Sequence, residues 1–203
     1  NINRFDKLND IKDGLPKYKY WYYGPRKRFF QSIRLKHYNQ AVFSDEYSLT
    51  LAYQNITESR VKQKTEEQFI STRIEKLQIV DIKTDFSKNK SVFKINYGFD
   101  SRFQKLNSNA TLSNQKSVLY NTTRYPDGGT NVFNNALYCQ VSINLMKGVL
   151  LSGGSRYNAN SLKSLFTDTN TIRLPFSEIN VKNYSLSNSF QVVYSINNSL
   201  KLN

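Results

Sequence analysis

Four charged residues stand where two strand-like segments of this sequence meet, and they are the side chains best placed to do chemistry. Glu58 and Arg60 continue the polar face of one segment, and Arg73 and Glu75 begin the polar face of the next. If the two segments pair as neighbouring strands, all four side chains project from one face. They could then form an ion-pair ladder across the strands, worth about 0.2–1 kcal/mol per pair. They could equally bind charges on another part of the protein.

A second group of candidates lies in the longest connection between segments. Arg124, Tyr125 and Asp127 offer two charges and a flat ring, which could contact a charged chelate. The same stretch reads Tyr125-Pro-Asp-Gly128, which is a strong turn signal. The role of these residues could therefore be purely conformational.

No constellation for covalent catalysis is present in the sequence. His37 is the only histidine and has no Cys or carboxylate cluster near it, so a metal or haem role is not indicated. Cys139 is the only cysteine and has no partner for a disulfide bond within the chain. Neither Gly128-Gly129 nor Gly153-Gly154 precedes a phosphate-binding sequence. The sequence predicts a protein that is not an enzyme and has no cofactor or metal.

The elements that position these residues are strands, because apolar and polar residues alternate with a period of two. In the clearest segment, Phe93, Ile95, Tyr97 and Phe99 share one face and polar residues occupy the other. One segment is irregular, because Leu77 and Ile79 fall on the face opposite its other apolar residues. The clear segments are 46–57, 92–103, 133–146 and 182–196, and the weaker ones are 28–38, 73–86 and 149–158, with an eighth strand beginning near Leu200.

The connections between these segments alternate in length. Short connections lie near 39–45, 87–90, 147–148 and 197–198, and long ones near 58–72, 104–131 and 159–181. Alternation of tight turns with long loops is typical of outer-membrane barrels. The regular stretches also reach the roughly 9–11 residues that a tilted strand needs to cross a bilayer. The sequence predicts an all-β, antiparallel up-and-down transmembrane β-barrel with its apolar side chains facing lipid.

Composition agrees with this fold class. The 203 residues contain 29 Lys and Arg against 15 Asp and Glu, a net charge of +14. Such a balance can indicate nucleic-acid or anionic-lipid binding, but no nucleic-acid-binding motif is present, and basic loops and turns account for it equally well. Mean hydropathy is −0.60, and low overall hydropathy is normal when only alternate residues face lipid. No apolar run is long enough for a membrane helix, and no signal peptide is recognisable.

An aromatic cluster precedes the first clear strand. Tyr20, Trp21, Tyr22 and Tyr23 could form part of the ring of aromatic side chains at the membrane–water interface. They could also be an ordinary aromatic loop. We therefore divide the chain into an outer loop and girdle segment, 1–27, and successive transmembrane hairpins, 28–203. Because the chain starts at Asn1 and stops within a strand pattern, we expect it to be a fragment.

Several short motifs, taken together, resemble the barrel of the TonB-dependent outer-membrane receptors of Bacteroidota. They are Trp21-Tyr-Tyr-Gly-Pro-Arg26, Leu49-Thr-Leu-Ala-Tyr-Gln54 with Glu58-Ser-Arg60, Arg73-Ile-Glu75, Arg124-Tyr-Pro-Asp-Gly128, Gly154-Ser-Arg-Tyr157 and Leu174-Pro-Phe176. The resemblance covers nearly the whole chain but only a central part of such a receptor. It implies about eight strands of a 22-stranded barrel, without the plug domain.

The resemblance also implies a function for the parent protein. Such receptors take up a scarce ligand, such as an iron–siderophore complex or haem, across the outer membrane of Gram-negative bacteria. The implied partners are outer-membrane lipid, the protein's own plug domain, TonB and the small-molecule ligand, with no nucleic acid. In this family barrel glutamates pair with plug arginines, which makes Glu58 and Glu75 candidates for that contact. Two alternatives remain: a small complete barrel with a structural or adhesion role, and a soluble lipocalin-like carrier.

Overall fold

The chain folds almost entirely into β-strands in a computed structural model that describes residues 11–12, 14–38, 40–168, 174–195 and 201–202. Seven of the described strands have 12 to 21 residues. These long strands are β4 (Lys27–Tyr38), β5 (Glu46–Lys64), β6 (Ile70–Asn89), β7 (Phe93–Ser113), β9 (Thr130–Met146), β10 (Val149–Leu165) and β11 (Glu178–Ser195). The short ones are β1 (Ile11–Lys12), β2 (Leu15–Pro16), β3 (Tyr18–Tyr23), β8 (Val118–Tyr120) and β12 (Lys201–Leu202).

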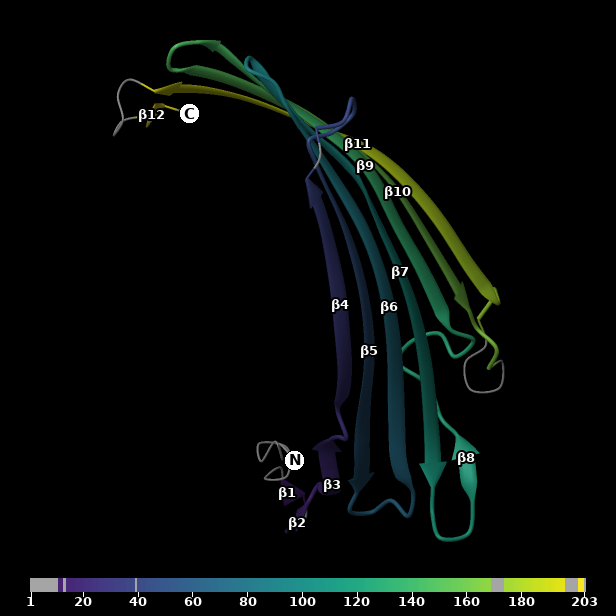
Figure 1. The fold of residues 1–203 in the computed structure, drawn as a ribbon. Coiled ribbons are helices and arrows are strands. Elements are labelled where there is room, and N and C mark those ends of the chain that lie inside the picture. The colour runs from purple at the N-terminus through teal and green to yellow at the C-terminus, as the bar shows by residue number, and fades with distance from the viewer. Residues whose placement is uncertain (1–10, 13, 39, 169–173, 196–200, 203) are drawn as a thin grey trace.

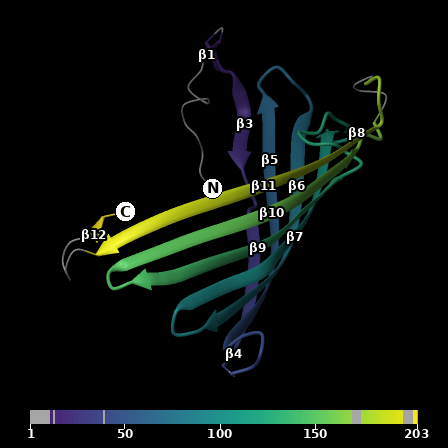
Figure 2. The same ribbon diagram turned by 90° about the horizontal axis from the view of Figure 1, so that it is seen from above.

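Ten of these strands form one antiparallel sheet, which is bowed and strongly twisted (Figures 1 and 2). Its order is β12-β11-β10-β9-β7-β6-β5, and β5 pairs on its other side with both β3 and β4. β4 pairs with the first two-thirds of β5 and β3 with its end, on either side of Gly24-Pro25. The predicted up-and-down antiparallel sheet is confirmed.

The connections alternate between the two ends of the sheet as predicted, but their lengths follow the prediction only in part, because residues 65–69 between β5 and β6 are fewer than residues 39–45 between β4 and β5. The connections β4–β5, β6–β7 and β9–β10 lie at one end of the sheet, the upper end in Figure 1. The connections β5–β6, β7–β9 and β10–β11 lie at the other end, where β7 also pairs with β8. We refer to these as the short-turn end and the long-loop end.

The strands are longer than the sequence predicts. Much of the predicted loops 58–72, 104–131 and 159–181 is strand, because β5, β7 and β10 continue to Lys64, Ser113 and Leu165. In the β5 extension polar residues occupy both faces, and in the β7 extension Leu106, Ala110 and Leu112 lie on the polar face, so the alternation that marks the apolar face ends while backbone pairing continues. The assignment of those stretches to loops was wrong for this reason.

The register divides the side chains between two faces, because directly paired residues project from the same side. One row that crosses the sheet is Leu35, Leu49, Thr84, Phe99, Leu137, Tyr157 and Leu186, and it lies on what we call the apolar face. The adjacent row is Lys36, Ser48, Asp85, Gly98, Tyr138, Arg156 and Ser187, on the polar face. The predicted division of the clear segments between two faces is confirmed.

Two rows of rings flank the apolar face. Near the short-turn end, His37, Tyr47, Phe86 and Tyr97 follow one another with centroid separations of 5.0, 6.2 and 5.1 Å. Nearer the long-loop end lie the pairs Phe29–Tyr53, Phe103–Phe133 and Tyr157–Tyr184. Tyr53 follows Tyr47 by six positions, about 20 Å along a strand. Aromatic girdles of membrane barrels flank an apolar band about 25 Å tall.

Apart from the turn before β5, where the Phe43 backbone oxygen accepts a hydrogen bond from the Tyr97 hydroxyl at 3.0 Å, nothing among the described residues packs onto the apolar face. Leu186 and Phe190 are 63% and 76% exposed, and the buried hydrophobic residues of the described chain are Ala110 and Ala136 alone. A water-soluble barrel would enclose its large apolar side chains. The apolar face therefore requires a covering from outside the described chain.

No helix in the described part of the chain is long and apolar enough to cross a membrane.

Candidate functional site on the polar face

The structure brings together the four charged residues that the sequence singled out. Glu58 of β5 pairs directly with Glu75 of β6, and Arg60 pairs with Arg73. All four lie on the polar face, near the long-loop end, as strand parity predicts. Like charges thus stand opposite each other, an arrangement that is unfavourable unless each charge has another partner.

Three of the four charges have partners on other strands or loops. The Arg26 Nη2 atom lies 2.5 Å from Glu58 Oε1. The Arg60 guanidinium lies over the ring of Tyr23, 4.6 Å from its centroid. Arg73 Nε donates to the backbone oxygen of Thr122 at 3.1 Å. No ion pair joins Glu58 or Glu75 to Arg60 or Arg73 in the described chain, so the cross-strand ladder is replaced by these contacts.

Two of the four charged side chains, Glu75 and Arg60, have a buried atom without a hydrogen-bond partner among the described residues. For Arg60 this is the Nε atom, although its guanidinium is held over the Tyr23 ring. Glu75 is buried, at 8% exposure, and its Oε1 atom has no partner among the described residues. A buried carboxylate oxygen without a donor is costly. Glu75 is therefore ready to accept a hydrogen bond from a group outside the described chain.

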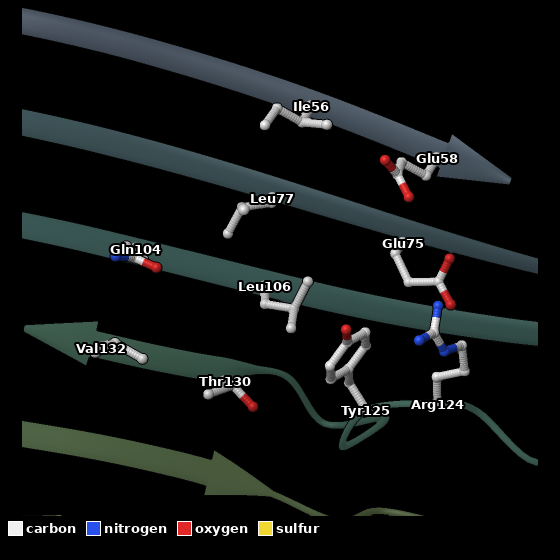
Figure 3. Close-up of a pocket in the computed structure, with 10 residues that line it drawn as sticks. All are labelled: Ile56, Glu58, Glu75, Leu77, Gln104, Leu106, Arg124, Tyr125, Thr130 and Val132. Carbon is white, nitrogen blue, oxygen red and sulfur yellow. The ribbon is translucent and has the colours of Figure 1, made fainter. Parts of the chain in front are cut away.

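Residues 121–129, which we call the inward loop, fold onto the polar face beside Glu75 (Figure 3). Asn121 Nδ2 donates to Ser71 Oγ at 2.9 Å, and the Arg73–Thr122 bond lies next to it. At the far end of the loop, Gly128 N donates to Leu165 O at 3.0 Å. The loop is thus fixed to β6 on one side and to β10 on the other.

The inward loop covers a pocket of about 350 Å³. Its floor is apolar, with Ile56, Leu77, Leu106 and Val132 below the ring of Tyr125, and Figure 3 shows Arg124 turned toward the Glu75 carboxylate. This accounts for the irregular position of Leu77 in the sequence pattern. A pocket of this volume with a carboxylate, a guanidinium and a ring at its rim is within the size range of small-molecule sites.

Asp127 has a different position from Arg124 and Tyr125. Its carboxylate accepts hydrogen bonds from the backbone N–H groups of Thr167 and Asp168, at 2.9 and 2.7 Å, and from the Thr167 hydroxyl. Burial raises the pKa of Asp127, but these hydrogen bonds outweigh it and hold the pKa below its ordinary value. Both oxygens are engaged in joining the inward loop to the end of β10.

The aromatic cluster lies beyond the apolar band. β3 pairs with β5 from Arg60 to Lys64, so Trp21 and Tyr23 share the polar face and only Tyr20 and Tyr22 lie on the other. The rings that flank the apolar band belong instead to β4–β7 and β9–β11. The girdle role of residues 20–23 stays a prediction, and this placement leaves it to Tyr20 and Tyr22.

Metal ligation has no support in the described residues, where no cluster of three His, Cys, Asp or Glu side chains is found. His37 lies on the apolar face, with its ring 5.0 Å from that of Tyr47. Cys139 is exposed on the same face.

Sequence reasoning missed two contacts that shape the polar face. One is the pairing of Arg26 with Glu58, for which the sequence carries no signal. The other is the ring of Tyr138, whose hydroxyl reaches across to Asp85 over Gly98. A glycine within a strand is a signal of close approach, and Gly98 could have been identified on that basis.

The chain matches no protein-family model and no curated protein sequence. It resembles solved structures of three TonB-dependent receptors. The copper transporter OprC is 10% identical with a TM-score of 0.71, and the match covers 91% of this chain and 30% of that one. The ferric yersiniabactin uptake receptor FyuA from Yersinia pestis is 14% identical with a TM-score of 0.54, covering 96% and 30%. The siderophore receptor PiuA from Acinetobacter baumannii is 11% identical with a TM-score of 0.54, covering 93% and 33%.

These likenesses define the class of fold. The chain has the fold of a section of a TonB-dependent receptor barrel, and it spans about a third of the length of the structures it resembles. Those structures are a transporter and receptors, and not enzymes, in agreement with the sequence-based expectation.

Proposed function

We propose that the chain forms part of the wall of a TonB-dependent transporter in the outer membrane of a Gram-negative bacterium. The observation that carries this proposal is the uncovered apolar face with its two aromatic rows, on a sheet of receptor-barrel fold. The polar face then lines the lumen, and the long-loop end faces outside. The transported ligand is a scarce one, such as an iron–siderophore complex or haem.

Glu75 is the residue through which this wall would hold the plug domain. Its buried, unsatisfied Oε1 atom suits a guanidinium or ammonium group of the plug, and the neighbouring Glu58 adds negative charge beside it. A hydrogen bond to a charged group contributes about 1.5–3 kcal/mol. Arg60 and Arg73, which are held by Tyr23 and Thr122, would orient the loops around this contact.

Arg124 and Tyr125 are the residues of the inward loop that would touch the ligand. They line the pocket from the solvent side, and the Arg124 guanidinium lies 5.5 Å from the Tyr125 ring centroid. A flat ring and a delocalised cation together suit an anionic, partly aromatic chelate. Asp127 would position this loop and not contact the ligand.

The test is uptake of radiolabelled iron, supplied as ferric siderophores or as haem, by the producing bacterium with and without the gene. We expect uptake of one of these to fall to background in the deletion strain and in a strain that lacks TonB, and the protein to fractionate with the outer membrane. A soluble protein would support the lipocalin-like carrier. An outer-membrane protein whose loss leaves TonB-dependent uptake unchanged would support the structural or adhesion barrel.

A further inference from the structure

The apolar face carries a row of lysines just beyond its aromatic boundary at the long-loop end. These lysines are Lys27, Lys76, Lys105, Lys163 and Lys182, which we call the lysine row. Each is exposed. The row crosses the sheet from β4 to β11, so it is a feature of the assembled sheet that the sequence does not show.

The register places the lysines as neighbours. Lys27 and Lys76 stand on either side of Thr57, and Lys105 and Lys163 on either side of Asn131. Strands are about 4.8 Å apart, so the members of each couple are about 10 Å apart at the backbone. Lys76 and Lys105 are diagonal neighbours, since Lys76 pairs with Asn107, at a separation of about 7–8 Å.

Most of this positive charge is not neutralised within the described chain. Lys163 has an ion pair with Glu178, at 3.1 Å. The described residues supply no ion pair for Lys27, Lys76, Lys105 or Lys182. Like charges held this close repel one another. An anion from outside the chain that bound between these lysines would reduce the repulsion.

The short-turn end of the same face is different. Beyond its aromatic row, the lysine on the apolar face of the described strands is Lys88, which pairs with Asp45 at 2.6 Å and donates to the Ala41 carbonyl oxygen. Charge is thus distributed unequally between the two boundaries of the apolar band. General snorkelling of lysines at membrane interfaces would not produce this difference.

We propose that the lysine row binds the phosphate groups of anionic lipid headgroups in the leaflet at the long-loop end. The inference rests on the proposed membrane location. The lysine ammonium groups lie about the thickness of one lipid headgroup beyond the apolar band. At that depth they meet the negatively charged lipid phosphates, where the electrostatic attraction is strongest. Thr57 and Asn131, between the lysine couples, add a hydroxyl and an amide that can donate to phosphate oxygens.

The experiment uses the full-length protein reconstituted into bilayers of phosphatidylcholine with a minor fraction of spin-labelled lipid. Its readout is the relative association of labelled phosphatidic acid and labelled phosphatidylcholine with the protein. The variant is K76Q/K105Q, which removes two neighbouring unpaired lysines. The control is K62Q/K94Q, which removes two exposed lysines from the polar face.

We expect the wild-type protein and the control to prefer phosphatidic acid, and the preference to fall on the order of tenfold in K76Q/K105Q at low salt. Free inorganic phosphate at the same concentration should not compete. An unchanged preference in K76Q/K105Q, an equal loss in the control, or competition by free phosphate would overturn the proposal. Insertion of all variants into neutral bilayers tests the proposed membrane location separately, because that step requires no anionic lipid.

Discussion

The polar face has two halves of different chemistry. On β4–β7 every strand carries charged side chains, which include Arg34, Glu46, Asp81 and Arg102. On β9–β11 the described polar face carries one charged side chain, Arg156, among Ser, Asn, Gln and apolar residues such as Val132 and Leu162. Arg156 itself reaches back to Asp100 of β7, with Nη1 2.8 Å from Oδ2.

The charged half and the uncharged half are suited to two different tasks of a lumen wall, which are holding the plug and letting the ligand pass. Charged side chains can hold a second domain through ion pairs, which are directional and reversible. Serine and asparagine bind water and polar ligands weakly, so a surface made of them favours passage over retention. We therefore expect the plug to be held by β4–β7, and the ligand, once it leaves the pocket under the inward loop, to pass along β9–β11.

A substitution at Gly98 should have the largest effect of those compared here. The Tyr138 side chain of the uncharged half crosses over Gly98 to reach Asp85 of the charged half. A Cβ atom at this position would overlap the Thr84 carbonyl oxygen and lie 2.5 Å from the Tyr138 hydroxyl oxygen. We expect Gly98→Ala to destabilise the barrel by about 1–3 kcal/mol or more, the usual cost of overpacking, because the backbone oxygen cannot move away. Gly154→Ala is the matched control in the uncharged half. Its added Cβ would meet the Ser189 hydroxyl at 3.1 Å, which can rotate.

Heat modifiability on gels and urea titration in detergent would measure both glycine variants. Gly154→Ala should keep a midpoint within the error of the wild-type protein. If Gly98→Ala were as stable as Gly154→Ala, the position of the Tyr138 ring over β7 would be wrong.

The apolar face should show no such difference between halves. Leu51 of β5 and Leu137 of β9 both lie on it, within the band between the aromatic rows. Arginine at the membrane midplane costs about 2–4 kcal/mol, so Leu51→Arg and Leu137→Arg should each lower the stability of the barrel in lipid by that order. Urea titration in lipid vesicles would measure the change. Unaltered stability in both variants would contradict the lipid-facing assignment.

Sequence alone could predict the sheet because alternation is a local property. The face of Phe93 or Leu137 follows from its neighbours in the chain, and turn residues mark the short connections. The site could be predicted only in part. Parity places Glu58, Arg60, Arg73 and Glu75 on one face, but their partners depend on where a loop folds.

The inward loop shows why the rest could not be predicted. Thr122 is 49 positions from Arg73, and it accepts a hydrogen bond through its backbone oxygen, which carries no residue-specific signal. The extended strands were missed for a related reason. At Lys105 and Asn107 the apolar face becomes polar, while Leu106 and Ser108 on the other face are half-buried and buried, so pairing continues after the alternation that marks the apolar face has ended.

Substitution of Glu75 tests whether the charged half holds the plug. Glu75→Gln keeps the shape of the side chain and removes the charge that would attract a basic plug residue. We expect sensitivity to large antibiotics to rise a few-fold because the plug fits less tightly. Ser187→Ala, in the uncharged half, should leave sensitivity unchanged. Equal sensitivity in both variants would assign Glu75 a purely structural role.

The smallest expected effect concerns Asp127, which joins the inward loop to the end of β10. Its folded-state pKa lies below the ordinary value of about 3.9, so its ionised form stabilises the loop at neutral pH. That stabilisation is fully present above the ordinary pKa and is lost as the pH falls toward the folded-state value. We expect protection of the inward-loop amides from hydrogen exchange to decrease below about pH 4, relative to amides of β6. Asp127→Asn should show low protection at every pH, because the amide is a weaker acceptor for the N–H groups of Thr167 and Asp168. A wild-type acid transition that persists in Asp127→Asn would assign the loop's acid sensitivity to another carboxylate.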